Sequence, residues 1–212
     1  MEFLADPRAI EARSMAIIEE LLAPWRNLLA PEDFLVARRV VHATGDPEVV
    51  AHLVFQNAPV AAGVAALRQK APLICDVAMV AAGIKGRLPA GTSVRVMVEA
   101  PEVAAAASRD GVTRALAGIR LLGGALAGSV VAVGNAPTAL YGVLELFRAG
   151  IRPALVIGVP VGFVGAAEAK EALLATDLPA VVLRGTRGGS AVAAAVVNVL
   201  AALAFRSDLA AG

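Results

Sequence analysis

His42 is the side chain in this sequence whose type and surroundings best suit proton transfer. It lies in the segment Val-Val-His-Ala-Thr-Gly-Asp-Pro, in which Thr44 and Asp46 follow it closely. The ordinary pKa of histidine, about 6.5, lets this residue type act as a general acid or base near neutral pH. The alternative is a protonated histidine that caps a helix and interacts with its dipole. The second histidine, His52, fits the exposed face of a short helix.

Four loops rich in glycine and proline are the second feature that could bind a ligand. They span residues 78–88, 134–140, 159–168 and 184–190, and each follows an apolar segment that we predict to be a strand. Glycine lets a ligand approach the backbone closely, and a helix N-terminus attracts anions. In an open α/β sheet, ligands bind beyond the carboxyl ends of the strands. Each loop alone could be an ordinary turn, but four at one edge predict a ligand site.

Several other kinds of site are excluded by the sequence. It contains no G-x-x-x-x-G-K-[ST], no dinucleotide-type G-x-G-x-x-G, no G-x-S-x-G and no H-E-x-x-H. One cysteine and two histidines do not make a typical zinc site, so no metal is expected, and Cys75 is predicted to be inert packing in a buried strand. The 19 basic and 18 acidic residues give a net charge of +1, which argues against nucleic-acid binding.

The elements that must position these residues change character along the chain. Up to about residue 69 the spacing of apolar residues predicts helices, which begin at Pro7, Pro31, Pro47 and Pro59. Beyond that point short apolar strands alternate with helices, and the strands are predicted at 72–77, 93–98, 129–133, 154–158 and 180–183. This order predicts a single α/β domain over 1–212: a mostly parallel sheet of about five strands, helices on both faces, and a helical N-terminal segment.

A membrane protein is the alternative that the composition raises, because 58% of the residues are hydrophobic and only 17% are charged. Uncharged runs at 121–144 and 188–205 are long enough to span a bilayer. The first run, however, contains Asn135 and Pro137 and is typical of a strand, a turn and a helix, and the second is rich in alanine. Aromatic residues, at 4%, form no belt beside either run. We therefore expect no membrane insertion.

Taken together, the motifs resemble those of the precorrin-8X methylmutase family of cobalamin biosynthesis. The segments that carry the resemblance are IEARSMAIIEE, VVHATGDPE, PLICDVAMVAAGI, GVTRA, GNAPTALY, GVPVGFVGAAEAKE and RGGSAVAAAVVNVL. They cover the chain from about residue 10 to residue 200. The pair GNAPTAL and GVPVGFVGAAE is the most specific part of this resemblance.

The resemblance implies an isomerase that moves a methyl group from C-11 to C-12 of precorrin-8X, or of cobalt-precorrin-8, to give hydrogenobyrinate or cobyrinate. It implies that no cofactor is needed, because the shift is intramolecular. It also implies a cytoplasmic homodimer with the site near the subunit interface. His42 matches the family's catalytic histidine, which exchanges a proton with the macrocycle.

The resemblance also implies how the substrate is held. The ligand is a broad apolar ring that carries acetate and propionate groups, and arginine suits these carboxylates because its planar fork pairs with two oxygens. The residues that we expect to bind it are Arg13, Ser14, Thr44, Arg114, Asn135, Thr138, Arg187, Gly189 and Ser190. The alternative function is a tetrapyrrole-binding or carrier protein without catalytic activity that uses the same crevice.

Overall fold

The fold is built on one six-stranded sheet in the order β1-β6-β5-β4-β2-β3. A computed structural model describes residues 3–84 and 86–205. The strands are β1 (Leu53–Gln56), β2 (Leu73–Cys75), β3 (Val94–Val96), β4 (Val130–Val133), β5 (Leu155–Gly158) and β6 (Ala180–Leu183). All neighbouring pairs are parallel except β1 and β6, which run antiparallel with Leu53 opposite Leu183.

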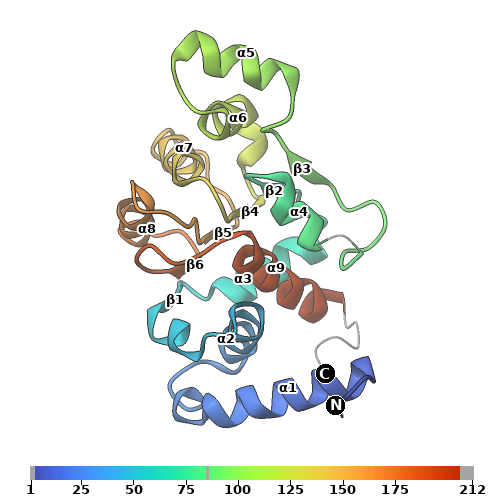
Figure 1. The fold of residues 1–212 in the computed structure, drawn as a ribbon. Helices are drawn as coiled ribbons and strands as arrows, with labels where there is room; N and C mark the ends of the chain where they lie inside the picture. The colour runs from blue at the N-terminus through green and yellow to red at the C-terminus, as the bar shows by residue number, and fades with distance from the viewer. Residues whose placement is uncertain (1–2, 85, 206–212) are drawn as a thin grey trace.

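Helices connect these strands and cover the sheet on both faces (Figure 1). The α-helices are α1 (Pro7–Leu21), α2 (Pro31–Thr44), α3 (Pro59–Arg68), α4 (Ala78–Ile84), α5 (Pro101–Asp110), α6 (Arg114–Leu122), α7 (Pro137–Arg148), α8 (Ala166–Leu174) and α9 (Ser190–Phe205). Short 3₁₀ helices are η1 (Ala23–Trp25), η2 (Pro47–His52) and η3 (Gly123–Leu126).

Two apolar cores fill the space between the sheet and its helices. On one face, α3, α4 and α9 pack on the strands, α2 packs on α9, and α1 forms an outer layer on α2. On the other face lie α6, α7 and α8, and α5 packs outside α6. The strands β2, β4, β5 and β6 are buried at every position, which explains their continuous apolar sequence. The high hydrophobic content therefore belongs largely to a sheet covered on both sides.

The helix boundaries follow from local chemistry that the sequence displays. Asp6 caps α1 by accepting a hydrogen bond from the backbone N–H of Arg8, and Pro7 occupies the first helical position. α2 ends at Gly45, whose φ of +66° is readily adopted by glycine. This stop leaves His42 in the last turn of α2 and turns the chain toward η2.

The predicted fold class is confirmed, with one difference in the sheet. All five predicted strands are present, but β1 is a sixth strand, which directly follows the short helix that is predicted to begin at Pro47. That helix is the 3₁₀ helix η2, which ends at His52, and β1 begins at the next residue. Within the described residues, no helix is long and apolar enough to cross a membrane.

Candidate functional site

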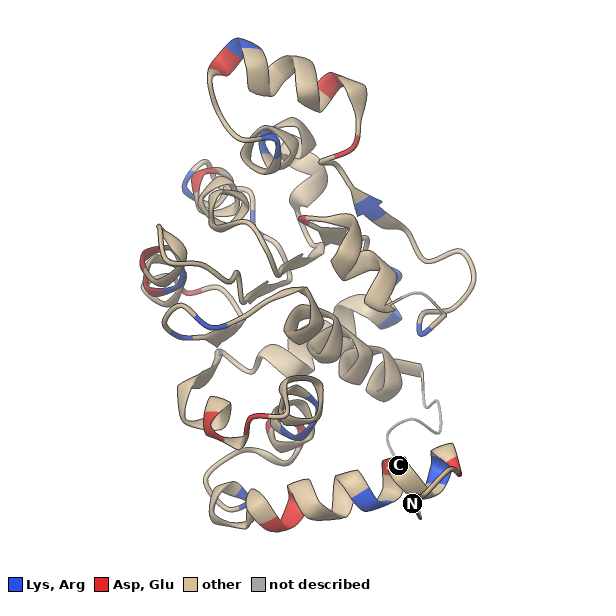
Figure 2. Cartoon of the chain, viewed as in Figure 1, with Lys and Arg blue, Asp and Glu red and all other residues tan. Residues whose placement is uncertain are grey.

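A hollow of about 300 Å³ lies between α2, α4 and α9 and contains His42 in its wall. α9 supplies a stripe of mostly small side chains at helical spacing, namely Ala191, Ala194, Ala195, Asn198, Val199, Ala202 and Leu203. Figure 2 shows that α9 carries no charged residue, in contrast to the mixed charges along α1. The wall that α9 forms is therefore mostly apolar and made of small side chains, which suits a flat apolar ligand.

Three arginines give this hollow a basic wall. Arg38 and Arg39 reach it from α2, and Arg87 reaches it from the segment after α4. Arg39 donates a hydrogen bond of 2.9 Å to Glu11 on α1, and Arg38 lies 3.4 Å from a carboxylate oxygen of Glu19. Among the described residues, none of those that line the hollow is an aspartate or a glutamate. The site therefore has the charge that an anionic ligand requires.

The basic wall lowers the pKa of Glu11, the acidic residue of α1 that accepts a hydrogen bond from Arg39. The hydrogen bond from Arg39 lowers the pKa of Glu11, and the charges of Arg39, His42 and Arg87 act in the same direction. Glu11 is therefore ionised near neutral pH and ties α1 to α2 at the edge of the hollow.

A second hollow of about 250 Å³ lies on the other side of His42, between α1 and the turn after α2. Its lining includes Ser14, Ile17 and Leu21 of α1, together with Gly45 and Pro47. His42 is exposed and borders both hollows, whereas the hydroxyl of Ser14 donates to the carbonyl oxygen of Ile10 in its own helix. Of the predicted site residues, Ser14 and His42 are the two that share a hollow among the described residues.

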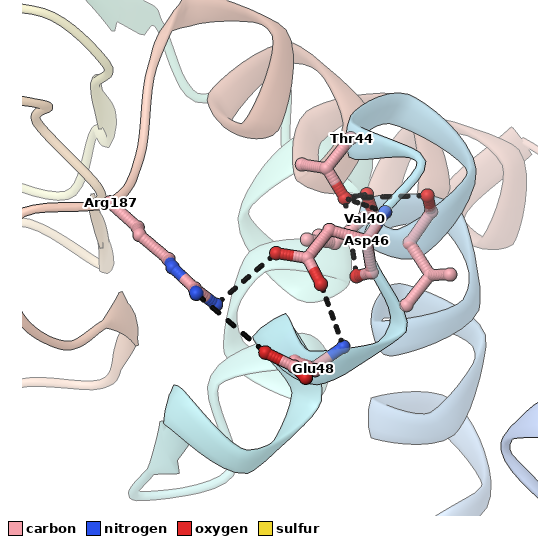
Figure 3. Close-up of polar contacts among 6 residues, drawn as sticks. Val40, Thr44, Asp46, Glu48 and Arg187 are labelled. Atoms are coloured by element: carbon pink, nitrogen blue, oxygen red, sulfur yellow. Dashed lines mark hydrogen bonds and ion pairs between the residues drawn. The ribbon is translucent and has the colours of Figure 1, made fainter.

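The turn that follows His42 is fixed by short polar contacts (Figure 3). The hydroxyl of Thr44 donates to the carbonyl oxygen of Val40 at 2.9 Å and accepts from the backbone N–H of Asp46 at 3.3 Å. Asp46 then accepts a hydrogen bond from the N–H of Glu48 and pairs with Arg187 at 3.2 Å. Thr44 therefore stabilises the helix end that presents His42.

Arg187 comes from the loop between β6 and α9, and it approaches this turn from the sheet edge (Figure 3). Besides Asp46 it faces Glu48 at 3.8 Å. The same loop is held from behind by Lys170, whose ammonium group donates to the carbonyl oxygens of Gly185 and Arg187 at 2.8 and 2.6 Å. The Lys170 residue is fully buried, and this burial lowers its pKa to about 8. The loop therefore links α8 to the turn beside His42.

The loop after β4 is organised by a buried carboxylate. Asp76, which directly follows β2, accepts hydrogen bonds from the backbone N–H groups of Gly134, Asn135 and Ala136 at 3.0, 2.7 and 2.7 Å. Gly134 lies against the start of α9, where an added Cβ would be 2.9 Å from the Cα of Ser190. Two of the four predicted loops thus meet at this sheet edge. The neighbouring Cys75 is buried, and its pKa is raised to about 12, mainly by that burial.

The remaining predicted residues lie in other places. The hydroxyls of Thr138 and Thr113 are 2.7 Å apart, which places Arg114 at the start of α6 beside α7. Arg13 is exposed on α1. Gly189 donates its N–H to the carbonyl oxygen of Val159, and Ser190 is the buried first residue of α9. The structure does not bring Arg13 or Arg114 into either hollow that contains His42.

Sequence reasoning missed four residues of the basic hollow: Arg38, Arg39, Arg87 and Asn198. Signals were available for three of them, because Arg38 and Arg39 precede His42 by four and three residues on one helix, and Arg87 lies in the predicted loop 78–88. The position of Asn198 depends on how α4 and α9 pack against α2. At Gly83 an added Cβ would be 2.7 Å from the Cβ of Ala194, so this close packing requires glycine.

A mostly parallel sheet with helices on both faces, and a basic hollow between α2, α4 and α9, define the chain as an α/β protein suited to an anionic ligand. The family model described as Precorrin-8X methylmutase matches residues 9–203. The chain therefore belongs to the precorrin-8X methylmutase family, whose members are intramolecular transferases of cobalamin biosynthesis, and the resemblance carried by its motifs is confirmed.

Individual relatives agree with this assignment over nearly the whole chain. The Precorrin-8X methylmutase of Pseudomonas aeruginosa is 45% identical, with 95% of this chain and 98% of that protein covered. The Cobalt-precorrin-8 methylmutase of Methanocaldococcus jannaschii is 39% identical, with 88% and 87% covered. The crystal structure of precorrin-8X methyl mutase from Thermus thermophilus is 38% identical and has a TM-score of 0.85, with 92% and 97% covered.

Proposed function

We propose that this protein catalyses the rearrangement of precorrin-8X or cobalt-precorrin-8, in which a methyl group moves from C-11 to C-12 of the macrocycle. The product is hydrogenobyrinate or cobyrinate, and it has the same atoms as the substrate. The observation that carries the proposal is the family match over residues 9–203, together with a basic hollow that His42 borders. No external cofactor takes part, because the bonds broken and formed lie within one molecule.

His42 acts in this proposal as the acid and base. It transfers a proton to a ring nitrogen or the adjacent conjugated system, which makes the methyl migration electronically favourable, and then takes the proton back. Its exposed position between two hollows supports this role, because a ring that spans both hollows would pass directly over the imidazole. General acid–base catalysis of this kind contributes about 10²–10⁴ in rate.

The predicted substrate-binding residues take different parts in the proposal. Ser14 borders the hollow beside His42, so it is placed to contact the ring edge. Thr44 and Arg187 form the contacts that fix the turn after His42, so we assign them a positioning role. The others lie at the sheet edge or on outer helices, where they would meet the carboxylates at the rim of a large ring. They are Arg13, Arg114, Asn135, Thr138, Gly189 and Ser190.

The proposal includes a homodimer in the cytoplasm with the site near the interface. Two large apolar side chains in the β5–α8 loop support an interface, since Phe163 and Val164 are 92% and 88% exposed. Along α1, Ile17 and Leu21 are about half exposed as well. We infer that a partner subunit covers these apolar side chains. Light scattering of the purified protein gives the subunit number directly.

Incubation with precorrin-8X and, separately, with cobalt-precorrin-8 tests the reaction. An isomerase changes the absorbance spectrum of the chromophore without changing its mass, and the substrate that is converted faster identifies the natural one. A spectrum that stays that of the substrate while the protein binds it would instead indicate the carrier function. That result would contradict the proposed activity.

A further inference from the structure

We propose that the hollow between α2, α4 and α9 is a carboxylate-binding site in which Arg38 and Arg87 hold an acidic side chain of the macrocycle. This inference rests on the proposed function for the identity of the ligand. It assigns a carboxylate to Arg38 and Arg87, neither of which is among the residues predicted from the motifs to bind the substrate.

Arg38 provides the first observation. Its side chain is only 13% exposed, and its Nε is buried without a hydrogen-bond partner. Its Nη1 faces Glu19, so the edge formed by Nε and Nη2 is the one that a ligand would approach. A carboxylate pairs with that edge through two parallel hydrogen bonds. Because a buried donor without a partner costs free energy, the ligand would satisfy a group that the protein alone leaves unpaired.

Asn198 provides the second observation, from the opposite wall of the hollow. Its Nδ2 donates to the carbonyl oxygen of Gly83 at 3.1 Å, and this contact fixes the orientation of the amide because a carbonyl requires a donor. Its Oδ1 is buried without a partner. Two residues that line the hollow therefore carry an unpaired donor and an unpaired acceptor. The acceptor suits an N–H group of the ligand or a water that accompanies it.

Charge and size identify the class of ligand. Arg87, which also lines the hollow, adds a second guanidinium, and the acidic residues Glu11 and Glu19 lie outside the lining and are paired with α2. Pockets for drug-sized ligands enclose about 300–1,000 Å³, so a hollow of about 300 Å³ accepts a propionate and the adjoining ring edge but not a whole tetrapyrrole. The apolar stripe of α9 would lie under that edge.

The test measures binding separately from turnover. The probe is dicyanocobyrinic acid, a corrinoid with free carboxylates, and its methyl ester serves as the uncharged form of the same ring. Isothermal titration calorimetry compares the wild type with Arg38→Gln, Arg87→Gln and Asn198→Asp. The matched control is Arg95→Gln, since Arg95 is exposed on the edge strand β3, away from the hollow. Circular dichroism verifies that each variant is folded.

Each arginine variant should bind the acid at least about 10-fold more weakly, because a hydrogen bond to a charged group is lost. Asn198→Asp should weaken it by a similar factor, because it adds a negative charge to the lining of the hollow that the acid enters. Binding of the methyl ester should change less than about 2-fold in the arginine variants, and Arg95→Gln should match the wild type.

Two results separate this inference from the proposed function. Unchanged affinity of Arg38→Gln and Arg87→Gln for the acid, with normal conversion of precorrin-8X by the wild type, overturns the carboxylate site and leaves the reaction intact. Loss of acid binding in these variants, with no conversion by the wild type, supports the site and overturns the reaction. Inorganic phosphate can also be added as a competitor of the acid. If it displaces the acid equally well from the wild type and from Arg87→Gln, this result also contradicts the site.

Discussion

The buried ammonium group of Lys170 donates a hydrogen bond of 2.6 Å to the carbonyl oxygen of Arg187, while the side chain of Arg187 pairs with Asp46 at 3.2 Å. Lys170 lies on α8, which covers the face of the sheet opposite to α2. The loop between β6 and α9 passes between them along the sheet edge. A buried residue on one face thus contributes to the position of the turn beside His42 on the other.

Replacing Lys170 by methionine should loosen this loop. The change keeps most of the side-chain volume but leaves the carbonyl oxygens of Gly185 and Arg187 unpaired, so we expect a loss of about 2 kcal/mol in the free energy of unfolding. Amide hydrogen exchange over residues 184–189 should become faster. The control is Arg184→Gln in the same loop, because the side chain of Arg184 pairs with Glu171 at the surface, and its loss should change stability by less than about 1 kcal/mol.

The lowered pKa of Lys170 gives this prediction a pH signature. Its pKa is about 8 in the folded protein, whereas the unfolded chain has the ordinary value of 10.5. Between these values the unfolded state binds more protons, so the stability of the wild type relative to Lys170→Met should rise as the pH increases from about 8 to 10.5. Denaturant unfolding at several pH values measures it. If the stability of the wild type relative to Lys170→Met instead falls over this pH range, the lowered pKa of Lys170 is contradicted.

Asp33, in the first turn of α2, predicts a second pH dependence of opposite sign. Burial raises its pKa from 3.8 to about 6, and the neighbouring charge of Glu32 adds to the effect. Between these values the folded state binds more protons, so Asp33 should lower the stability of the wild type relative to Asp33→Asn as the pH rises from about 4 to 6.

The variant Asp33→Asn should therefore be more stable than the wild type at pH 7. We expect its free energy of unfolding to be higher by about 1 kcal/mol, because solvent around a half-buried side chain reduces the full effect of the pKa shift. Thermal unfolding at pH 4 and pH 7 measures the difference. The exposed neighbour provides the control, and Glu32→Gln should stay within about 0.5 kcal/mol of the wild type at both pH values. Equal stability of Asp33→Asn and the wild type at pH 7 would contradict the prediction.

Most of the fold could be predicted because its elements carry strong local signals. Each central strand is a continuous apolar run, and proline marks the start of α1, α2, α3, α5 and α7. β1 could not be predicted in the same way. It has four residues, of which only Leu53 is buried, and it exists as a strand because it pairs with β6. Pairing between distant segments leaves little trace in a short sequence.

The site could be predicted only where its residues lie in one motif. His42 and Thr44 belong to a single helix end, and the structure shows that Thr44 fixes that end. The hollow beside His42 is formed by side chains of three helices, and its depth depends on the small residues of α9 and the approach of Gly83 to Ala194. Asn198 is polar within an alanine-rich helix, but its contact with α4 is set by packing.

The rate of precorrin-8X conversion by His42→Ala tests most directly whether His42 is the acid and base of the reaction. His52→Ala is the matched control, because His52 is exposed at the end of η2 and borders neither hollow that contains His42. We predict that His42→Ala is slower by about 10² or more while it still binds the product acid, and that His52→Ala keeps the wild-type rate. Conversion by His42→Ala at the wild-type rate would contradict the proposed role of His42.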